Sequence, residues 1–570
     1  GLAVSPDLRV AYVTSAWSHA LTAVELTTGK VLWSVDTARE PRGVVASADG
    51  KRVYVTHLVG ADITVVELGD GAPNVTRVAL PADALRTRLH AHASASLGYA
   101  ALLSPDGARL FVARHALGSG GAWQGNPTID VFSTALGEPL APSRGLPAFG
   151  TIPSTLLDLP DWGVDGAGAL PIGPSAGWAV PRALAYRKKT DHLLVASEAT
   201  AALVELDARS VAPGLVVNRT YALGGVTSTD PTTIQIPPDC GAPTGVALSA
   251  QEDVAWVYCR ATDNLVAVRL TPNGARGVRA ETEARDGVRM FTVRSPWGPF
   301  AVASLVAPPA PGDAEASALA LGRRLFYDAT EPAVSGGASC AGCHPDGRDD
   351  GHVWREMKKF PSDKRPTFVS GPSMVIPEQQ RDDGVVYGVA RQTPMLAGRV
   401  DAHGPYGWHA ESPDVIDRIK QGFSLHRWTE RPADGLTNRR RAEPLALFLR
   451  KGLVPPPRRE RELTVEEAVG KAIFDSPEAR CSTCHAPKTD FTDRSMVVVP
   501  LQTPPLFDED PNKLFRVPSL KFVGGTAPYY HDGSVATLEE LVAKNYDRMG
   551  KTTHLDEQAK AALVAYLKTL

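Results

Sequence analysis

The pentad CxxCH occurs twice in this chain, as Cys340-Ala341-Gly342-Cys343-His344 and as Cys481-Ser482-Thr483-Cys484-His485. In such a pentad two thiols can each add to a vinyl group of one porphyrin, and the adjoining histidine can reach the iron. The two copies use four of the six cysteines of the chain. They predict two covalently bound haem c groups, held by Cys340, Cys343, Cys481 and Cys484, with His344 and His485 as proximal ligands.

A structural zinc site is the alternative use of these cysteines. The two CxxC pairs lie about 140 residues apart in the chain. Zinc ribbons bring their pairs within about 15–20 residues of each other. The spacing therefore favours haem.

Length, charge and hydropathy limit the class of protein. A chain of 570 residues is too long for one ordinary core, so several domains are expected. A net charge of -3 gives no reason to expect nucleic acid as a partner. No apolar run approaches the roughly 18 residues of a membrane span. No signal peptide is visible, and because haem c is normally attached outside the cytoplasm, we expect a periplasmic or extracytoplasmic protein whose targeting segment has been removed.

The remaining two cysteines, Cys240 and Cys259, bracket two strand-like runs at 244–250 and 253–259. In an oxidising compartment they are expected to form a disulfide that closes this hairpin. Two buried free thiols are the alternative.

The first three hundred residues repeat a turn followed by strands. The clearest turn–strand units are SADGKRVYVT at 47–56 and SPDGARLFVA at 104–113, and the clearest following strands are TAVEL at 22–26 and TVVEL at 64–68. A period of about 42 residues with Asp-Gly turns is typical of β-propeller blades. Five copies are legible, and length divided by period predicts seven blades, with six as the alternative. These units resemble the YVTN-type β-propeller family over residues 1–305.

Proline-rich stretches mark the predicted joints of the chain. APPAPGD at 307–313 reads as a linker, and Pro455-Pro456-Pro457 precedes a helix start at which Thr464 and Glu467 fit a capping box. The predicted domains are a β-propeller at 1–305, a linker at 306–314, a first haem lobe at 315–457 and a second haem lobe at 458–570.

The two haem lobes look like copies of each other. In the first, ALGRRLFYD at 320–328 precedes the pentad, and RQTPML at 391–396 and GPYGWH at 404–409 follow it. In the second, AVGKAIFD at 468–475 precedes the pentad, and FRVPSL at 515–520 and APYYH at 527–531 follow it. The sequence thus predicts an all-β propeller followed by a mainly α-helical dihaem domain of two duplicated lobes.

These motifs, together with FRVPSLKFVGGTAPYYHDGSVATLEELV, resemble the bacterial dihaem cytochrome c peroxidase and MauG-like superfamily over about residues 315–570. The resemblance implies a six-coordinate C-terminal haem for electron transfer and an N-terminal haem that reacts with peroxide or another oxidant. It also implies a tryptophan between the haems and a bound Ca²⁺ between the lobes.

For the C-terminal haem, the resemblance takes the second iron ligand from the stretch after the TLEE helix. That stretch reads NYDRMG at 545–550, so Met549 is the favoured ligand and Tyr546 the alternative. A thioether would raise the reduction potential of the haem, and a phenolate would lower it.

For the first haem, the sequence departs from the family pattern. Trp408 is the candidate inter-haem tryptophan, and the candidate catalytic residues near it are His409, Glu411, Gln421 and Glu430. Glu411 or Glu430 would transfer protons during O–O cleavage, with a solvated surface acid as the alternative reading of each.

Further ligands are proposed around both haems. His352 is a candidate distal ligand that would close the first site. Arg391 and Arg516 are candidate partners of haem propionates, with placement on the protein surface as the alternative. Aligning the PY motifs places Trp408 opposite His531, whereas His409 matches His531 only if one residue is inserted.

The sequence favours a periplasmic dihaem c-type oxidoreductase, with one haem for electron transfer and the other for peroxide reduction or oxidation of a partner. Its partners would be a redox protein or small electron donor, and hydrogen peroxide or a protein substrate. The alternatives are an electron-transfer protein with the propeller as docking module, MauG-like oxidation of Trp or Tyr in a partner protein, and a catalytic propeller with a quinone-type cofactor.

Overall fold

The computed structural model describes residues 1–81, 95–117, 126–141, 178–223, 240–270, 284–285, 288–289, 300–305, 309–328, 331, 339–356, 389–425, 435–456, 461–499 and 514–570. The chain forms two compact units. The first unit holds Gly1–Gly342, and the second holds most of the chain from Cys343 to Leu570. Each is described by itself.

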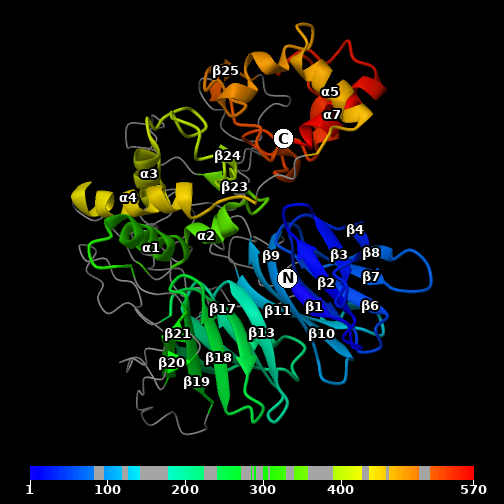
Figure 1. The fold of residues 1–570 in the computed structure, drawn as a ribbon, viewed down its shortest axis with the longest axis vertical. Coiled ribbons are helices and arrows are strands. Elements are labelled where there is room, and N and C mark those ends of the chain that lie inside the picture. The colour runs from blue at the N-terminus through cyan, green and yellow to red at the C-terminus, as the bar shows by residue number, and fades with distance from the viewer. Residues whose placement is uncertain are drawn as a thin grey trace, which may run out of the picture. The chain divides into compact units, whose positions relative to one another are not determined.

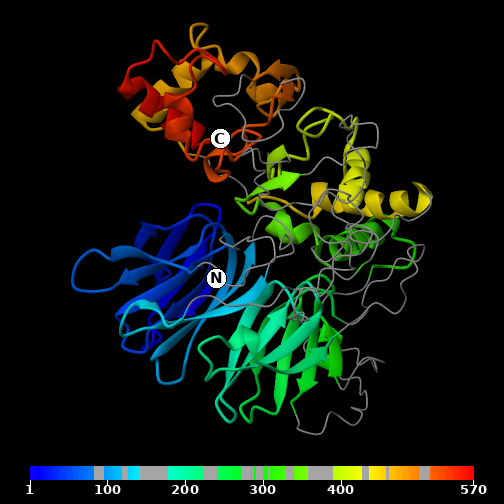
Figure 2. The same ribbon diagram turned by 180° about the vertical axis from the view of Figure 1, so that it is seen from behind.

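The first unit contains five four-stranded antiparallel sheets in its described residues (Figures 1 and 2). In each sheet the strands follow one another in chain order. The sheets consist of β1 (Leu2–Val4), β2 (Val10–Ser15), β3 (Ala20–Glu25) and β4 (Val31–Asp36); β5 (Pro41–Ala46), β6 (Arg52–His57), β7 (Asp62–Glu67) and β8 (Asn74–Ala79); β9 (Ala95–Leu103), β10 (Arg109–Leu117), β11 (Asn126–Ser133) and β12 (Glu138–Pro139); β13 (Pro181–Arg187), β14 (His192–Ser197), β15 (Ala202–Asp207) and β16 (Val217–Ala222); and β17 (Pro243–Leu248), β18 (Val254–Cys259), β19 (Asn264–Arg269) and β22 (Phe300–Ser304). A short pair, β20 (Ala284–Arg285) and β21 (Val288–Arg289), and a 3-10 turn, η2 (Pro213–Leu215), complete the described elements of this region.

The repeated Ser-x-Asp turn joins the first two strands of a sheet. In the second sheet the Ser47 hydroxyl donates to Asp49 Oδ1 at 2.5 Å and accepts from Arg52 N at 2.9 Å. Asp49 Oδ1 also accepts from Lys51 N at 3.0 Å. These side chains satisfy the backbone of a tight turn, which is why this short sequence starts a strand wherever it recurs.

Neighbouring sheets pack face to face through their alternating apolar residues. Val53 and Val55 of β6 are buried against Tyr12 and Leu21 of the first sheet, and the same kind of cluster joins each later pair of sheets. The first strand of each sheet also lies next to the first strand of the following one. This is the arrangement of propeller blades. The propeller class is confirmed, the five described sheets match the five legible repeats, and the total of seven or six blades stays a prediction.

The predicted disulfide is confirmed. Cys240 and Cys259 are bonded, with their Cα atoms 5.2 Å apart. Both cysteines are buried, and Cys259 ends strand β18. The disulfide therefore joins the two strands of the β17–β18 hairpin at its open end, opposite the turn.

Helix α1 (Ala314–Tyr327) begins just after the Pro-rich stretch, where the Asp313 carboxylate accepts from Ala316 N at 2.9 Å. It packs against the fifth sheet of the first unit. Arg323 forms an ion pair with Asp263 in the β18–β19 turn, and Arg260 lies over the Tyr327 ring at 4.3 Å from its centroid. Helix α1 therefore belongs to the first compact unit, which ends at Gly342, within the first pentad. The domain limits given by the sequence stay predictions.

The second unit is mainly helical among its described residues, which confirms the predicted class of the C-terminal part. The Thr464–Glu467 capping box is present at the start of α5 (Val465–Asp475). Helix α3 (Val415–Leu425) packs against α4 (Gly435–Lys451), and both α5 and α6 (Leu538–Ala543) pack against α7 (Glu557–Leu567). The elements from the first pentad onward are α2 (Cys340–Cys343), η3 (Pro345–Gly347), β23 (Val353–Glu356), β24 (Val389–Gln392), α3 (Val415–Leu425), α4 (Gly435–Lys451), α5 (Val465–Asp475), η4 (Cys481–Thr483), η5 (Pro487–Thr489), β25 (Met496–Val498), β26 (Leu514–Arg516), η6 (Val523–Gly525), α6 (Leu538–Ala543) and α7 (Glu557–Leu567). None of the described helices is long and apolar enough to cross a membrane.

Candidate haem sites and the junction of the two lobes

The second pentad forms a compact turn that presents His485 as a metal ligand. Its first residues make the 3-10 turn η4, and His485 N donates to the Cys481 carbonyl at 3.1 Å. The imidazole Nδ1 donates to the Phe491 carbonyl at 3.0 Å, which leaves the lone pair of Nε2 for a metal. Burial lowers the pKa of His485, so the ring stays in the neutral form that binds iron. These residues fit a haem c attached at Cys481 and Cys484.

The first thiol of each pentad has a raised pKa. Burial raises the pKa of Cys340 to about 12 and that of Cys481 to about 11.

The tail loop, residues 544–553, lies against the second pentad. Lys551 N donates to the Ala479 carbonyl at 2.7 Å. A Cβ on Gly550 would lie 3.1 Å from the Cys481 sulfur. Met549, the favoured second ligand, is half-buried in this loop, whereas Tyr546, the alternative, is 65% exposed.

Arg516 offers a second observation that fits a haem. Its Nε–H is buried and has no hydrogen-bond partner among the described residues. Burial lowers the pKa of this guanidinium; Tyr406 offsets part of this shift, and the neighbouring charge of Arg494 adds to it. A carboxylate such as a haem propionate would satisfy both the hydrogen bond and the charge. The other candidate, Arg391, is buried and donates from Nη2 to His409 Nε2 at 3.2 Å.

The first pentad is joined to the RQTPML segment. Helix α2 is followed by the turn η3, and the Gly347 carbonyl accepts from both Leu396 N and Ala397 N at 2.9 Å. His352, the candidate distal ligand, is half-buried, and its backbone carbonyl accepts from Thr393 N at 3.4 Å. Iron ligation by His352 stays a prediction.

The two PY loops have the same structure, which confirms the duplication. Tyr406 pairs with Ser412, and Tyr529 pairs with Val535, across loops of equal length. Each tyrosine hydroxyl also donates to the carbonyl six residues earlier, that of Val400 at 3.1 Å and that of Val523 at 2.9 Å. Because no residue is inserted, Trp408 is the counterpart of His531, and His409 is not.

The two lobes exchange reciprocal contacts at these counterparts. Gln392 N donates to the His531 carbonyl at 2.7 Å, and Arg516 N donates to the Trp408 carbonyl at 2.9 Å. Gln392 and Arg516 occupy the same place in RQTPML and FRVPSL. The rings of Trp408 and His531 meet edge to face, with centroids 6.3 Å apart, and Phe515 stacks on His531 at 3.8 Å. Trp408 therefore lies where the pseudo-symmetric lobes meet.

The remaining catalytic candidates differ in their surroundings. Both ring nitrogens of His409 are engaged, since Nδ1 donates to the Leu514 carbonyl at 2.8 Å and Nε2 accepts from Arg391. Glu411 accepts from His409 N at 3.0 Å and from Arg418 Nη1 at 2.6 Å. These contacts close the loop around Trp408.

Gln421 lies on helix α3, where its Nε2 donates to Asp417 Oδ2 at 3.0 Å. Glu430 lies outside the described residues. The structure thus brings Trp408, His409, Arg391 and Arg516 together at the junction of the lobes, whereas the bond between Gln421 and Asp417 lies within helix α3. All these roles stay predictions.

The predicted calcium site finds no support. Within the described parts of the chain, no group of three or more His, Cys, Asp or Glu side chains could hold a metal ion.

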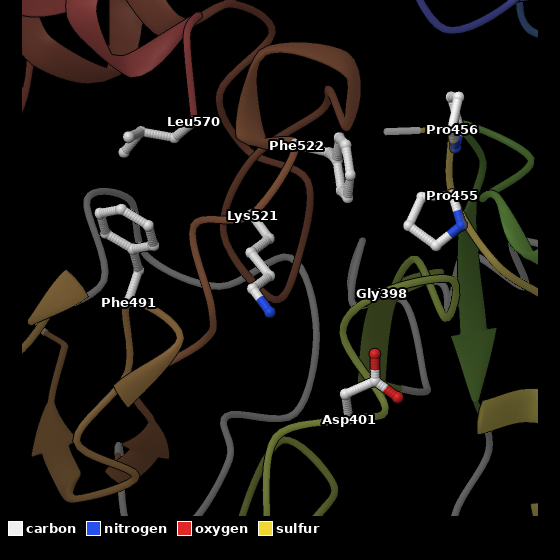
Figure 3. Close-up of a pocket in the computed structure, with 8 residues that line it drawn as sticks. All are labelled: Gly398, Asp401, Pro455, Pro456, Phe491, Lys521, Phe522 and Leu570. Atoms are coloured by element: carbon white, nitrogen blue, oxygen red, sulfur yellow. The ribbon is translucent and has the colours of Figure 1, made fainter. Parts of the chain in front are cut away.

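A cavity of about 350 Å³ lies next to Phe491, in the loop that follows the second pentad (Figure 3). Phe491, whose carbonyl accepts from His485, forms part of its wall. Lys521 also faces it and is ion-paired with Asp490. The lining residues are Gly398, Asp401, Pro455, Pro456, Phe491, Lys521, Phe522 and Leu570. Among them, Pro455 and Pro456 belong to a predicted joint, and Lys521 and Phe522 belong to the stretch FRVPSLKFVGG that carries the family resemblance.

Comparison with known proteins gives short similarities to redox proteins. No family model matches the chain. It is 36% identical over 63 residues to a cytochrome c551 peroxidase of Nitrosomonas europaea, covering 11% of this chain and 19% of that protein. It is 26% identical over 147 residues to the hydrazine synthase subunit gamma of Kuenenia stuttgartiensis, covering 19% of this chain and 42% of that protein. A crystal structure of a MauG-like protein associated with microbial copper homeostasis is 24% identical, covers 46% of this chain and 91% of that one, and has a TM-score of 0.32.

The chain spans less than half the length of both curated relatives. The similarity to a cytochrome c peroxidase, predicted from the motifs, is confirmed by these comparisons over a short stretch.

Proposed function

We propose that this protein is an extracytoplasmic dihaem c-type oxidoreductase of the peroxidase and MauG-like class. The haem held at His485 transfers electrons, and the haem held at His344 reacts with peroxide or oxidises a partner. The observation that carries the proposal is the reciprocal junction of two CxxCH lobes at Trp408 and His531. The Cys240–Cys259 disulfide supports an oxidising compartment.

When bound, each haem supplies one-electron redox chemistry at its iron. The residues of the chain orient and tune it. The Phe491 carbonyl fixes His485 in the tautomer that binds iron, and the half-buried Arg516, whose Nε–H is buried, would pair with a propionate. Met549 is the proposed second ligand at the His485 site, because it is half-buried in the loop that touches Cys481, while Tyr546 points largely to solvent. A thioether ligand suits an electron-transfer role, since it raises the reduction potential.

Trp408 is the proposed connection between the two sites. Its ring lies at the junction and contacts His531, which itself stacks on Phe515. Reduction of hydrogen peroxide to two waters takes two electrons and two protons, so electrons held in the second lobe must cross to the first. A half-buried aromatic ring at the contact of the lobes shortens that crossing.

The test is rapid mixing of the full-length, haem-loaded protein with hydrogen peroxide, in the oxidised and half-reduced states. The proposal expects a change in the absorption of one haem that is first order in peroxide, followed by oxidation of the other. No spectral change in either state would exclude peroxide as the substrate. Repeating the experiment with a reduced partner protein, and following its Trp and Tyr residues by mass spectrometry, tests the MauG-like alternative.

One observation favours a plain electron carrier as the second candidate. Both nitrogens of His409 are engaged and Glu411 is ion-paired with Arg418, so these two groups are committed to the loop around Trp408. In that case the propeller serves for docking, and neither haem binds small ligands. Failure of cyanide and of peroxide to perturb either haem in any redox state would support it.

A further inference from the structure

Asn545 organises the loop that carries both candidate ligands of the second haem. Its side chain is 1% exposed. Its Oδ1 accepts from Met549 N at 2.9 Å. Its Nδ2 donates to the Gly550 carbonyl at 3.0 Å and to Thr552 Oγ1 at 3.1 Å, with a longer contact to the Met549 carbonyl at 3.3 Å. The buried amide of Asn545 therefore fixes the positions of Met549, Gly550 and Thr552.

A second set of side-chain hydrogen bonds, the outer clamp, is made by Asp547. Asp547 Oδ1 accepts from Thr552 N at 2.7 Å and from Thr553 N at 3.0 Å, and Oδ2 accepts from Thr553 Oγ1 at 2.8 Å. Asn545 precedes Tyr546 in the chain and Asp547 follows it, so side-chain hydrogen bonds hold the backbone on both sides of the tyrosine.

The backbone of Tyr546 is held in an unfavourable conformation. Its φ is 46°, in the left-handed region that a bulky side chain rarely adopts. In this conformation its ring is 65% exposed, whereas Met549 is half-buried beside the second pentad. The bonds of Asn545 thus oppose a relaxation of the loop that would release Tyr546 and withdraw Met549.

We propose that Asn545 is a positioning residue that decides which side chain of the tail loop binds the iron of the second haem, keeping Met549 bound and Tyr546 out. This inference rests on the proposed function, because it requires a haem at His485. It goes beyond that function by assigning the choice of ligand to a residue that never touches the iron.

The experiment compares full-length, haem-loaded wild type with Asn545→Ala and Asn545→Asp. The aspartate keeps the acceptor for Met549 N and loses the donors to Gly550 and Thr552. The readouts are the far-red charge-transfer absorption of thioether-bound ferric haem and the reduction potential of that haem. The loss of two or three hydrogen bonds is expected to lower the ratio of methionine-bound to unbound protein roughly tenfold or more. The potential should fall as well, and more in the alanine variant.

Three further variants separate the possible outcomes. Asp547→Asn is the matched control, because it weakens the outer clamp and leaves every bond of Asn545 in place; it should keep the thioether absorption. Asn545→Ala combined with Tyr546→Phe should lose any phenolate absorption that the single variant gains. Met549→Ala should abolish the thioether absorption in the wild-type background. Haem content and thermal unfolding show that each variant is folded.

One result would contradict the assignment of Met549 as ligand, and a different result would contradict the positioning role of Asn545. If wild type shows no thioether absorption, the assignment of Met549 is wrong, whatever the variants do. If wild type shows it and Asn545→Ala retains both the absorption and the potential, Asn545 does not position the ligand, and the proposed function is untouched.

Discussion

Gly470 lies where helices α5 and α7 cross, and substituting it with alanine should destabilise the second haem lobe. A Cβ at this position would overlap the Ala562 carbonyl oxygen and lie 2.8 Å from Tyr566 Cβ. The overlap is with backbone, which cannot rotate away, so the helices must separate. Overpacking of this kind costs about 1–3 kcal/mol, and we expect the upper end, about 3 kcal/mol.

Gly422→Ala is the matched control, since it is the same substitution inside helix α3. Nothing lies within 4 Å of the Cβ it would add. It should stabilise the protein by up to about 1 kcal/mol, because alanine favours a helix over glycine by about that amount. For a unit of this size, about 3 kcal/mol lowers Tm by roughly 6–12 °C.

The assay is thermal unfolding of the haem-loaded full-length protein, followed by circular dichroism and by haem absorption. Gly470→Ala should unfold earlier by both signals, and Gly422→Ala should unfold no earlier than wild type. A Gly470→Ala protein with unchanged Tm, or a Gly422→Ala protein destabilised to the same extent, would refute the packing argument.

Three other predictions concern charge and electron transfer. Trp408→Phe should slow electron exchange between the haems about tenfold or more in pulse-radiolysis experiments and leave both haem spectra unchanged; unchanged exchange would remove Trp408 from the path. Arg516→Gln should lower the reduction potential of one haem by about 40–90 mV in a spectroelectrochemical titration, because loss of about 1–2 kcal/mol of charge stabilisation disfavours the added electron; equal shifts at both haems, or none, would contradict propionate pairing. The hydrogen-bonded ion pair with Arg461 lowers the pKa of Glu467 from 4.5 to about 2, so the stability that this ion pair contributes is present above pH 4.5 and is lost as the pH falls toward 2. Because solvent screening keeps this contribution below about 1 kcal/mol, Glu467→Gln should flatten the stability–pH curve between pH 4.5 and 2 and change the stability little at pH 7.

Local patterns predicted the parts of the structure that depend on short stretches of chain. The pentads, the Ser-x-Asp turns, the Cys240–Cys259 hairpin and the capping box at Thr464 each involve residues close in sequence or a repeated spacing. The geometry that satisfies them is local, so the residue types suffice to indicate it.

Contacts between distant segments could not be predicted in the same way. The exchange of hydrogen bonds between Gln392 and His531, and between Arg516 and Trp408, uses backbone groups that carry no residue-specific signal. The attachment of α1 to the fifth sheet through Arg323 and Asp263 joins residues 60 positions apart. Asn545 was visible in the sequence only as a neighbour of the candidate ligands, because its four contacts depend on how the loop closes. The equal spacing of the two PY loops was the one available signal for pairing Trp408 with His531.

We propose that the two haems are unequal and that the one held at His344 is open to reaction. Electron paramagnetic resonance of the full-length haem-loaded protein tests it most directly, in the oxidised and half-reduced states, before and after peroxide is added. We expect a low-spin ferric signal from the His485 site and, in at least one of these states, a high-spin ferric signal from the His344 site that peroxide removes. Two low-spin signals in both states, unchanged by peroxide, would contradict it.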